Sequence, residues 1–444
     1  MIHRNLITEI ENWAKNPKRK PLVLRGARQV GKTTLVNEFA KRFDHFVSLN
    51  LEKRYEALLF EESNDIREVI AKIFLFKNIQ QDQKRTLIFI DEIQNSPKAV
   101  AMLRYFYEEF PQFHVIAAGS LLETLMDTHI SFPVGRVQYM TLRPCSFSEF
   151  LGAIGKTELK KATENLEIPF GMNELMSDMF KTYSLIGGMP EVVSNFAEHQ
   201  DIVRLTDIYN SLLVGYKDDV EKYARTETQK NIIRLILSVG WTRAAQQISL
   251  GNFAQSAYRA REVGEAFRTL EKTHVVELSY PTTSAVLPIL PETKRKPKLF
   301  WFDTGLVNFV AGVQQEILEV ADLQDAWRGN SAEQIVAQEL ISSTSHVGAK
   351  RYFWVRGTQS SSAEVDFVQN INGRLIPIEV KSGHNAHLRS LHQFMNASNQ
   401  DIAVRVWNNP LSIDEVKTQE GKIFKLYNVP YYYVEHLDKL LGNK

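Results

Sequence analysis

Between about residue 20 and residue 150, short apolar runs of strand length alternate with segments of helical periodicity. Uninterrupted apolar runs are typical of parallel strands that helices cover on both faces. The alternation therefore predicts a parallel α/β domain over residues 1–150. The expected strands lie at residues 21–24, 46–51, 87–90, 115–118 and 137–142.

The pattern changes after residue 150. Residues 151–225 show helical periodicity without strands, interrupted by a Gly-Gly-Met-Pro turn at 187–190, and predict a helical lid or connector. Residues 226–298 give two helices and then a β-rich run, an order typical of a winged helix-turn-helix. Residues 299–444 return to an α/β pattern, so the chain as a whole is of the α/β class.

A phosphate-binding loop motif, G-x-x-x-x-G-K-[ST], follows the first apolar run. Its two glycines permit backbone angles that a side chain would obstruct, so successive N–H groups can surround a β-phosphate. Lys32 adds charge for the β- and γ-phosphates, Thr33 offers a hydroxyl to Mg²⁺, and the helix starting at Thr34 directs its positive end to the anion. An ordinary glycine-rich turn is the alternative. The predicted site, with ATP and Mg²⁺ as ligands, consists of Gly26, Ala27, Arg28, Gln29, Val30, Gly31, Lys32, Thr33 and Thr34.

Two further strand ends carry polar residues that suit the same chemistry. The run 87–90 ends in Asp91, which can hold Mg²⁺, and Glu92, which can polarise a water, so this Walker B strand predicts hydrolysis as well as binding. The run 115–118 leads to Ser120, which would lie beside the γ-phosphate if this strand is inserted between the other two. An exposed acid pair and a serine that caps a helix are the alternatives.

Composition and length limit the number of domains, the partners and the cellular location that this chain can have. A length of 444 residues is too great for one domain, and 44% hydrophobic residues suffice for filled cores. The net charge of +1 gives no global attraction to nucleic acid, so DNA would need a local basic patch. The single Cys145, a start without a secretory apolar segment and the lack of membrane-length runs predict a soluble cytoplasmic protein without a membrane partner.

The second helix of the predicted winged helix-turn-helix is rich in basic residues, and a further basic run follows at 294–298. These charges can contact DNA phosphates, which makes DNA a candidate partner. Acidic residues on the same helix can equally balance them and leave a solvated surface. The basic residues are Arg259, Arg261, Arg268 and Lys272, and the acids are Glu262, Glu265 and Glu271.

An Asn-Gly pair at 372–373 predicts a two-residue β-hairpin turn. Counting outward places Asp366 opposite Glu379 and Glu364 opposite Lys381. Opposed carboxylates destabilise a hairpin unless something compensates their charge. A divalent cation between Asp366 and Glu379 would do so, with Lys381 orienting a water or stabilising charge. A salt bridge from Lys381 to Glu364, without any chemistry, is the alternative.

Alternation along the same hairpin predicts one apolar and one charged face. A capped helix upstream can complete a site on the charged face, through Glu333 in preference to Glu339. The expected apolar face consists of Val365, Phe367, Ile376, Ile378 and Val380, with Asp366, Glu379 and Lys381 on the other face.

Several of these motifs together resemble a family of prokaryotic AAA-type ATPases. The resemblance implies an AAA core, a helical and winged-helix middle and a C-terminal domain related to the restriction-endonuclease-like fold. It also implies that Glu333, Asp366, Glu379 and Lys381 occupy the positions of a PD-(D/E)XK nuclease site, although many domains of that fold have lost activity. The likeness rests on the motifs at 26–34, 91–94, 135–137, 187–190, 302–306, 364–367 and 379–383, together with Glu333.

AAA proteins commonly complete their site with an arginine from a neighbouring subunit, so the resemblance also suggests a homo-oligomer. Arg136 is the candidate, and an internal salt bridge to Glu149 is the alternative. We expect ATP hydrolysis to switch the winged-helix and C-terminal units on DNA, with nuclease action as a further hypothesis. The alternative is a nucleotide-gated adaptor that holds a protein partner and has an inactive nuclease-like domain.

Overall fold

The computed structural model of the chain describes most of its residues. Side chains are not described at 220–223 and 330. The described ranges are 2–82, 84–119, 133, 135–314, 330–357, 363–381 and 388–442.

The first unit is built on a parallel sheet in the order β2-β3-β4-β1-β5. The third apolar strand, β4, lies between β1 and β3, which is the insertion that the sequence analysis required. The carboxyl ends of β1 and β3 therefore meet at one edge of the sheet. The strands are β1 (Leu22–Arg25), β2 (His45–Asn50), β3 (Thr86–Asp91), β4 (His114–Ala118) and β5 (Gln138–Thr141).

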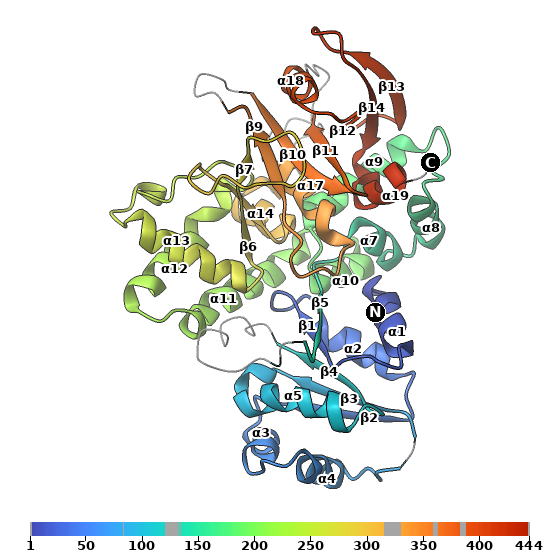
Figure 1. Cartoon of the computed structure of the whole chain (residues 1–444), viewed down its shortest axis with the longest axis vertical. Helices are drawn as coiled ribbons and strands as arrows, with labels where there is room; N and C mark the ends of the chain where they lie inside the picture. Colours follow the sequence, from blue (N-terminus) through green and yellow to red (C-terminus); the bar gives the residue numbers. More distant parts are fainter. Residues whose placement is uncertain are drawn as a thin grey trace.

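Helices cover both faces of this sheet (Figure 1). Alternate residues of β1 point to opposite faces, so Leu22 and Leu24 pack in one apolar cluster and Val23 in the other. The first cluster contains residues of α1 (Leu6–Lys15) and α2 (Lys32–Ala40). The second contains residues of α3 (Arg54–Glu61), α4 (Ile66–Phe76) and α5 (Pro97–Glu109), and η1 (Ile93–Asn95) follows β3.

The middle of the chain is helical, as its periodicity predicts. Between the helices α9 and α10, Gly187 and Gly188 of the turn 187–190 fit closely against other backbone segments, where a Cβ would not fit. The helices are α7 (Phe147–Ala153), α8 (Thr157–Asn165), α9 (Asn173–Ile186), α10 (Pro190–His199), η3 (Val203–Leu205) and α11 (Thr206–Tyr223).

Two helices and an antiparallel ribbon then follow in the order that the sequence predicts. The helices α12 and α13 pack on each other, and β6 pairs with β8, while Gln247 forms an isolated bridge to Lys298. The elements are α12 (Glu227–Val239), η4 (Gly240–Arg243), η5 (Phe253–Gln255), α13 (Ala260–Lys272), β6 (Val276–Ser279) and β8 (Lys298–Trp301).

The last unit has a mixed sheet in the order β13-β14-β12-β11-β10-β9-β7. Residues of α17 belong to the apolar cluster shared with the middle helices, and residues of α18 belong to a separate cluster. Figure 1 shows this sheet at the opposite end of the molecule from β2 and β3. The elements are β7 (Pro281–Thr282), α14 (Thr304–Val310), α17 (Asn330–Ser342), β9 (Tyr352–Val355), β10 (Glu364–Ile371), β11 (Arg374–Val380), α18 (Arg389–Ala397), β12 (Ile402–Trp407), β13 (Ser412–Lys417), β14 (Ile423–Pro430), η6 (Tyr431–His436) and α19 (Leu437–Gly442).

The third and fourth units interleave near residue 298. β7 lies within the segment 226–298 but pairs with β9 of the last sheet, whereas β8 starts at residue 298 and pairs back with β6. After β6 the chain therefore adds β7 to the last sheet, and it then returns to pair β8 with β6. Strand partners so far apart in sequence are not visible in hydrophobic periodicity.

The hairpin has the register that was counted from its turn. Phe367 pairs with Ile378, and Asn372 and Gly373 both have positive φ, at 52° and 76°. One face assignment was wrong: Val365 packs in the cluster that contains Val368, and Phe367 packs in the opposite one. The cause is an irregularity, because the pairing of β10 with β9 shifts register between Val365 and Val368.

No helix in the described part of the chain combines the length and hydrophobicity needed to span a bilayer. Cys145 is buried and is not in a disulfide.

Candidate nucleotide-binding site

The phosphate-binding loop joins β1 to α2 at the carboxyl edge of the first sheet. Gly26 has φ 137°, and a Cβ there would lie 2.1 Å from the Leu142 carbonyl oxygen. Gly31 has φ 91° and forms the N-cap of α2. Both conformations are disfavoured for residues with side chains. The two fixed glycines of the motif are therefore required by the backbone path itself.

Lys32 is buried at the start of α2, with 8% of its surface exposed. Its Nζ donates hydrogen bonds to the Gly26 oxygen at 3.0 Å and to the Ala27 oxygen at 2.8 Å. Burial lowers the pKa of Lys32 to about 8, against the opposing influence of Glu92 and Asp91. The ammonium group thus folds back onto its own loop. A bound phosphate can replace the two carbonyl oxygens as its hydrogen-bond partner.

Thr33 and Asp91 form the oxygen pair expected for Mg²⁺. The Thr33 Oγ1 donates to Asp91 Oδ2 at 2.7 Å, so the hydroxyl and the carboxylate already lie together. Hydroxyl and carboxylate oxygens are the ligands that Mg²⁺ prefers, and it needs few protein ligands when phosphates and water complete its shell. The donor set fits the metal that the sequence implies.

Glu92 follows Asp91 at the end of β3 in a left-handed conformation, with φ 49°. Burial raises the pKa of Glu92 and that of Asp91. The Gln94 amide donates to the Glu92 carboxylate and orients it. This positioning contact was not predicted, although Gln94 is part of the motif at 91–94.

A cavity of about 810 Å³ lies over these groups. Its walls include Lys32, Asp91 and Glu92 on one side and Pro190 and Asn195 of α10 on the other. The size is within the range of small-molecule sites in proteins. The helical unit therefore forms one wall of the candidate nucleotide site, which agrees with the predicted lid.

Arg4, a residue that the sequence analysis did not identify, forms hydrogen bonds that fix the phosphate-binding loop. Its Nη1 donates to the Val30 oxygen at 2.8 Å, its Nη2 to the Arg143 oxygen at 2.6 Å and its Nε to Glu149 Oε2 at 2.9 Å. Arg4 is itself buried. It therefore ties the loop to α7, which begins the helical unit.

A second connection runs from the loop to α11. Asp219, which is buried, forms an ion pair with the Arg28 guanidinium, and the Tyr216 hydroxyl donates to the Arg28 carbonyl oxygen at 2.9 Å. Arg28 was expected to belong to the phosphate site. It also links that site to the lid, and periodicity alone carries no signal for such a contact.

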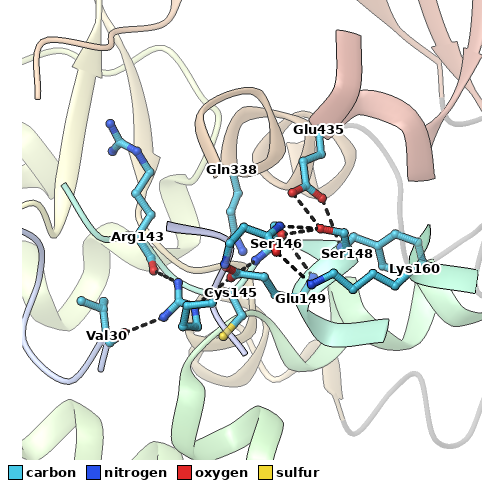
Figure 2. Close-up of polar contacts among 12 residues, drawn as sticks. Val30, Arg143, Cys145, Ser146, Ser148, Glu149, Lys160, Gln338 and Glu435 are labelled. Carbon is cyan, nitrogen blue, oxygen red and sulfur yellow. Dashed lines mark hydrogen bonds and ion pairs between the residues drawn. The ribbon is translucent and has the colours of Figure 1, made fainter. Parts of the chain in front are cut away.

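A buried polar network extends from α7 to the last unit (Figure 2). The Ser148 backbone N–H and hydroxyl donate to the Glu435 carboxylate at 3.1 Å and 2.9 Å. Burial raises the pKa of Glu435 to about 7. Together with the Arg4 contacts, this network joins the loop, the helical unit and the last unit in one continuous set of hydrogen bonds.

Two of the predicted catalytic residues, Ser120 and Arg136, are not seen at the nucleotide cavity. Ser120 lies outside the described residues. Arg136 precedes β5 and so lies at the amino edge of the sheet, away from the loop. Its Nε is 2.7 Å from Glu108 Oε1. The predicted salt-bridge partner Glu149 was wrong, because Glu149 pairs with Arg4.

The residues of the nuclease-like site come together, and a lysine joins them. Lys298 Nζ lies 2.7 Å from Glu333, 2.6 Å from Glu364 and 3.9 Å from Asp366. The Lys381 Nζ is 2.8 Å from Glu379 Oε1, and the Val380 N–H donates to Asp366 at 2.8 Å. The alternative interpretation, a Lys381–Glu364 salt bridge, was therefore wrong, because Glu364 pairs with Lys298. The compensation expected from a cation is provided by the buried Lys298 ammonium.

The carboxylates of this cluster are strongly perturbed. Burial raises the pKa of Glu333 to about 8 and that of Glu379 to about 7, and it also raises the pKa of Asp366. The surrounding carboxylates raise the pKa of Lys298 despite its burial. Among the described residues, no group of three or more His, Cys, Asp and Glu side chains is arranged to hold a metal ion.

The basic residues of the predicted winged helix-turn-helix have different surroundings. Arg261 is exposed and pairs with Glu265, as the alternative interpretation required. Arg268 and Lys272 line a cavity against the first and last units. Lys298, expected in a solvated basic run, is buried in the carboxylate cluster. A DNA surface on this unit would therefore use only part of the predicted patch.

The shifted pKa of Lys32 predicts a pH dependence of ATP binding. Lys32 in the empty site loses its proton as pH rises through about 8, and phosphates require the charged form. The affinity for ATP should therefore fall above that pH by up to about tenfold per pH unit. Calorimetric titration with ATP on either side of that pKa measures the change.

The matched variant for this measurement is Lys32→Arg, because a guanidinium stays charged over the whole range. Its affinity, whatever its absolute value, should not vary with pH. An equal decline in both proteins would contradict the assignment to Lys32.

Comparisons with known proteins cover the chain in three parts. Residues 18–151 match a family model described as an AAA domain. Residues 177–317 and 328–431 match models described as domains of unknown function, DUF8612 and DUF4143. No curated protein matches the chain.

Several solved structures show limited similarity to the chain. The Walker-type ATPase PABY2304 of Pyrococcus abyssi is 15% identical, with 70% of this chain and 96% of that chain covered at a TM-score of 0.47. The Orc1 protein of Aeropyrum pernix in complex with DNA is 12% identical, with 72% and 94% covered at a TM-score of 0.28. The Holliday junction branch migration motor RuvB of Thermotoga maritima is 15% identical, with 66% and 93% covered at a TM-score of 0.28.

The family match begins just before the loop and ends in α7, so it contains Lys32, Thr33, Asp91 and Glu92. It agrees with the geometry of the loop and of the Walker B strand, and it implies ATP together with a divalent metal. Residues 18–151 form a P-loop ATPase domain of the AAA type.

Proposed function

We propose that this chain is a Mg²⁺-dependent ATPase whose nucleotide state switches a DNA- or protein-binding module formed by the units after residue 150. The observation that carries the proposal is the convergence of Lys32, the Thr33–Asp91 pair and Glu92 beneath one cavity. Each has the chemistry that phosphoryl transfer to water requires.

The protein groups have separate roles in this proposal. Lys32 leaves the carbonyl oxygens of Gly26 and Ala27 and binds the β- and γ-phosphates. Thr33 and Asp91 hold Mg²⁺, which neutralises phosphate charge when bound. Glu92, oriented by Gln94, polarises the attacking water. Ser120 as γ-phosphate sensor and Arg136 supplied to a second copy of the chain complete the proposed site.

The switch rests on the contacts that connect the loop to the lid. The Val30 and Arg28 carbonyl oxygens accept from Arg4 and Tyr216, so movement of the loop around a phosphate alters contacts with both α7 and α11. A ligand shifts a conformational equilibrium only by its different affinity for the two states. These contacts give bound ATP a means of distinguishing lid positions.

For the last unit, Lys298 favours the adaptor function over nuclease action. Its ammonium group lies among Glu333, Glu364 and Asp366, where a catalytic cation would have to bind. A buried charge in such a set is costly to remove without a replacement. We propose that this cluster stabilises the unit and that the unit acts through binding.

The Glu92→Gln variant tests hydrolysis separately from binding. The amide cannot act as a base, so turnover should fall by about 100-fold or more, while ATP affinity stays within about threefold of wild type. Phosphate release under saturating ATP and Mg²⁺ measures the first quantity, and calorimetry measures the second.

Glu62→Gln, at the exposed C-cap of α3, is the matched control and should leave both quantities unchanged. Turnover by Glu92→Gln at the wild-type rate would exclude Glu92 as the group that activates water.

A further inference from the structure

A second cavity, of about 330 Å³, lies where three units of the chain meet. Its lining comes from the end of β5, from α13 and β6, and from α17 with the segment before β9, all labelled in Figure 1. Ala27 of the phosphate-binding loop also reaches it. This cavity is separate from the nucleotide cavity, in which Ala27 is not a lining residue.

Positive charge dominates the walls. One of the two glutamates present, Glu277, is already paired with Arg351 through contacts of 2.7 Å and 3.2 Å. The other, Glu271, accepts a hydrogen bond from the Leu278 N–H at 3.0 Å, and burial raises its pKa. The remaining cationic lining residues are Arg143, Arg268, Lys272 and Lys350.

Arg143 lacks an acidic partner in this set. Its guanidinium donates only to the carbonyl oxygens of Thr344, at 3.3 Å, and His346, at 3.1 Å, and no described carboxylate lies within ion-pair distance. Burial and Arg351 lower the pKa of Arg143 to about 10, against the opposing influence of Glu277. Figure 2 shows its side chain extending away from the network around Ser146. A partly buried cation without an ion-pair partner has lost some of its hydration, and a bound anion would compensate for that loss.

We infer that this cavity binds a small phosphorylated anion whose phosphate group lies between Arg143 and Arg268. Guanidinium groups bind phosphate through paired, charge-assisted hydrogen bonds. The volume is at the lower end of the range for small-molecule sites, which limits the ligand to about the size of a sugar phosphate or a mononucleotide. Because Arg351 on this wall is buried and already paired with Glu277, a small ligand fits better than the backbone of a duplex.

The position of Ala27 connects this cavity to the ATPase site. Ala27 lines the second cavity, and its carbonyl oxygen accepts from Lys32 Nζ at 2.8 Å. A ligand that moves this part of the loop changes the position from which Lys32 reaches phosphate. Coupling of this kind is reciprocal, so the anion and ATP alter each other's affinity by the same factor.

Calorimetric titration of the full chain with pyrophosphate tests the inference. The experiment uses Lys32→Ala protein, in which the phosphate-binding loop contributes no ammonium, and wild type saturated with Mg²⁺-ADP. Both should show one pyrophosphate-binding event. Adding Arg143→Gln or Arg268→Gln should weaken it by about tenfold or more, because each removes a charge-assisted contact.

Arg261→Gln is the matched control, since this arginine is on α13 but its side chain is 88% exposed and pairs with Glu265. It should leave pyrophosphate affinity unchanged. Arg268 is also exposed, so its variant should fold even if Arg143→Gln loses the contacts to Thr344 and His346, and circular dichroism checks both.

Either of two kinds of result would overturn the inference. One is the absence of pyrophosphate binding outside the loop, or equal binding in Arg268→Gln. The other is stoichiometric displacement of pyrophosphate by a short DNA duplex, which would assign the site to nucleic-acid phosphates. The binding result does not depend on turnover, so failure of the ATPase proposal would be seen separately in the phosphate-release assay.

Discussion

Lys32→Ala is expected to lower ATP turnover by about 100-fold or more, the order of loss seen when a charged or hydrogen-bonding group that stabilises a transition state is removed. Lys32 is the only lysine of the loop motif, and its Nζ lies over the loop, bonded to the Gly26 and Ala27 oxygens. No other described lysine lines this cavity. Steady-state phosphate release with ATP and Mg²⁺ measures the effect.

The matched control is Lys41→Ala, which removes a lysine just beyond the end of the same helix α2. Its side chain is 63% exposed and pairs with Glu38 at the surface, so turnover should stay at the wild-type rate. Phosphate release by Lys32→Ala within about threefold of wild type would mean that the loop does not act in hydrolysis.

Gly188→Ala is expected to lower the free energy of unfolding by about 3 kcal/mol, at the upper end of the usual cost of overpacking. A Cβ at this position would lie 2.2 Å from the Cys145 oxygen and 2.9 Å from its nitrogen. Both atoms belong to the backbone, and the Cys145 N–H donates to the Gly188 oxygen at 2.7 Å. The new methyl group can be accommodated only by separating these segments.

Urea denaturation followed by circular dichroism measures that loss. Gly215→Ala is the control, because Gly215 lies inside α11, where an added Cβ would meet no atom of another segment within 4 Å, and alanine favours helix by up to about 1 kcal/mol. The two variants should shift the denaturation midpoint in different directions or by clearly different amounts. Equal midpoints for Gly188→Ala and wild type would show that the turn can relax.

These contacts give a physical reason for two motifs on which the family resemblance rests. The carboxylate of Asp303 accepts from the Gly188 N–H at 2.7 Å and from the Leu306 N–H at 3.0 Å. A Cβ at Gly305 would lie 2.0 Å from the Ile186 oxygen. The turn at 187–190 and the segment at 302–306 are therefore packed against each other. Their role in the structure is to join the lid to the start of the last unit.

The structure could be predicted from local sequence where one short segment determines the backbone geometry. The two glycines of the loop require positive φ, and the Asn-Gly turn determines the pairing of Phe367 with Ile378. For the first sheet, the sequence analysis considered one feature of the strand order, the insertion of β4 between β1 and β3, and the structure has it. In each case the prediction depends on a residue type that the local conformation or the local chemistry requires.

Contacts between distant segments could not be predicted in the same way. Arg4 bonds to Val30 and Glu149, and Lys298 enters the carboxylate cluster through the interleaving of two units. Neither lysine nor arginine shows in its own sequence neighbourhood whether it faces solvent or a buried acid. Lys298 is the first residue of the strand β8, whose other residues are apolar and buried, and this position is a weak signal of burial.

The central claim is that the loop around Lys32 binds a nucleoside triphosphate, and calorimetric titration of wild type and Lys32→Ala with Mg²⁺-ATP tests it most directly. The account predicts one binding event in the wild type and an affinity at least about tenfold weaker in the variant, since a buried ion contact to phosphate is removed. Well-folded wild type that gives no heat with ATP, or a variant that binds ATP as tightly, would contradict it.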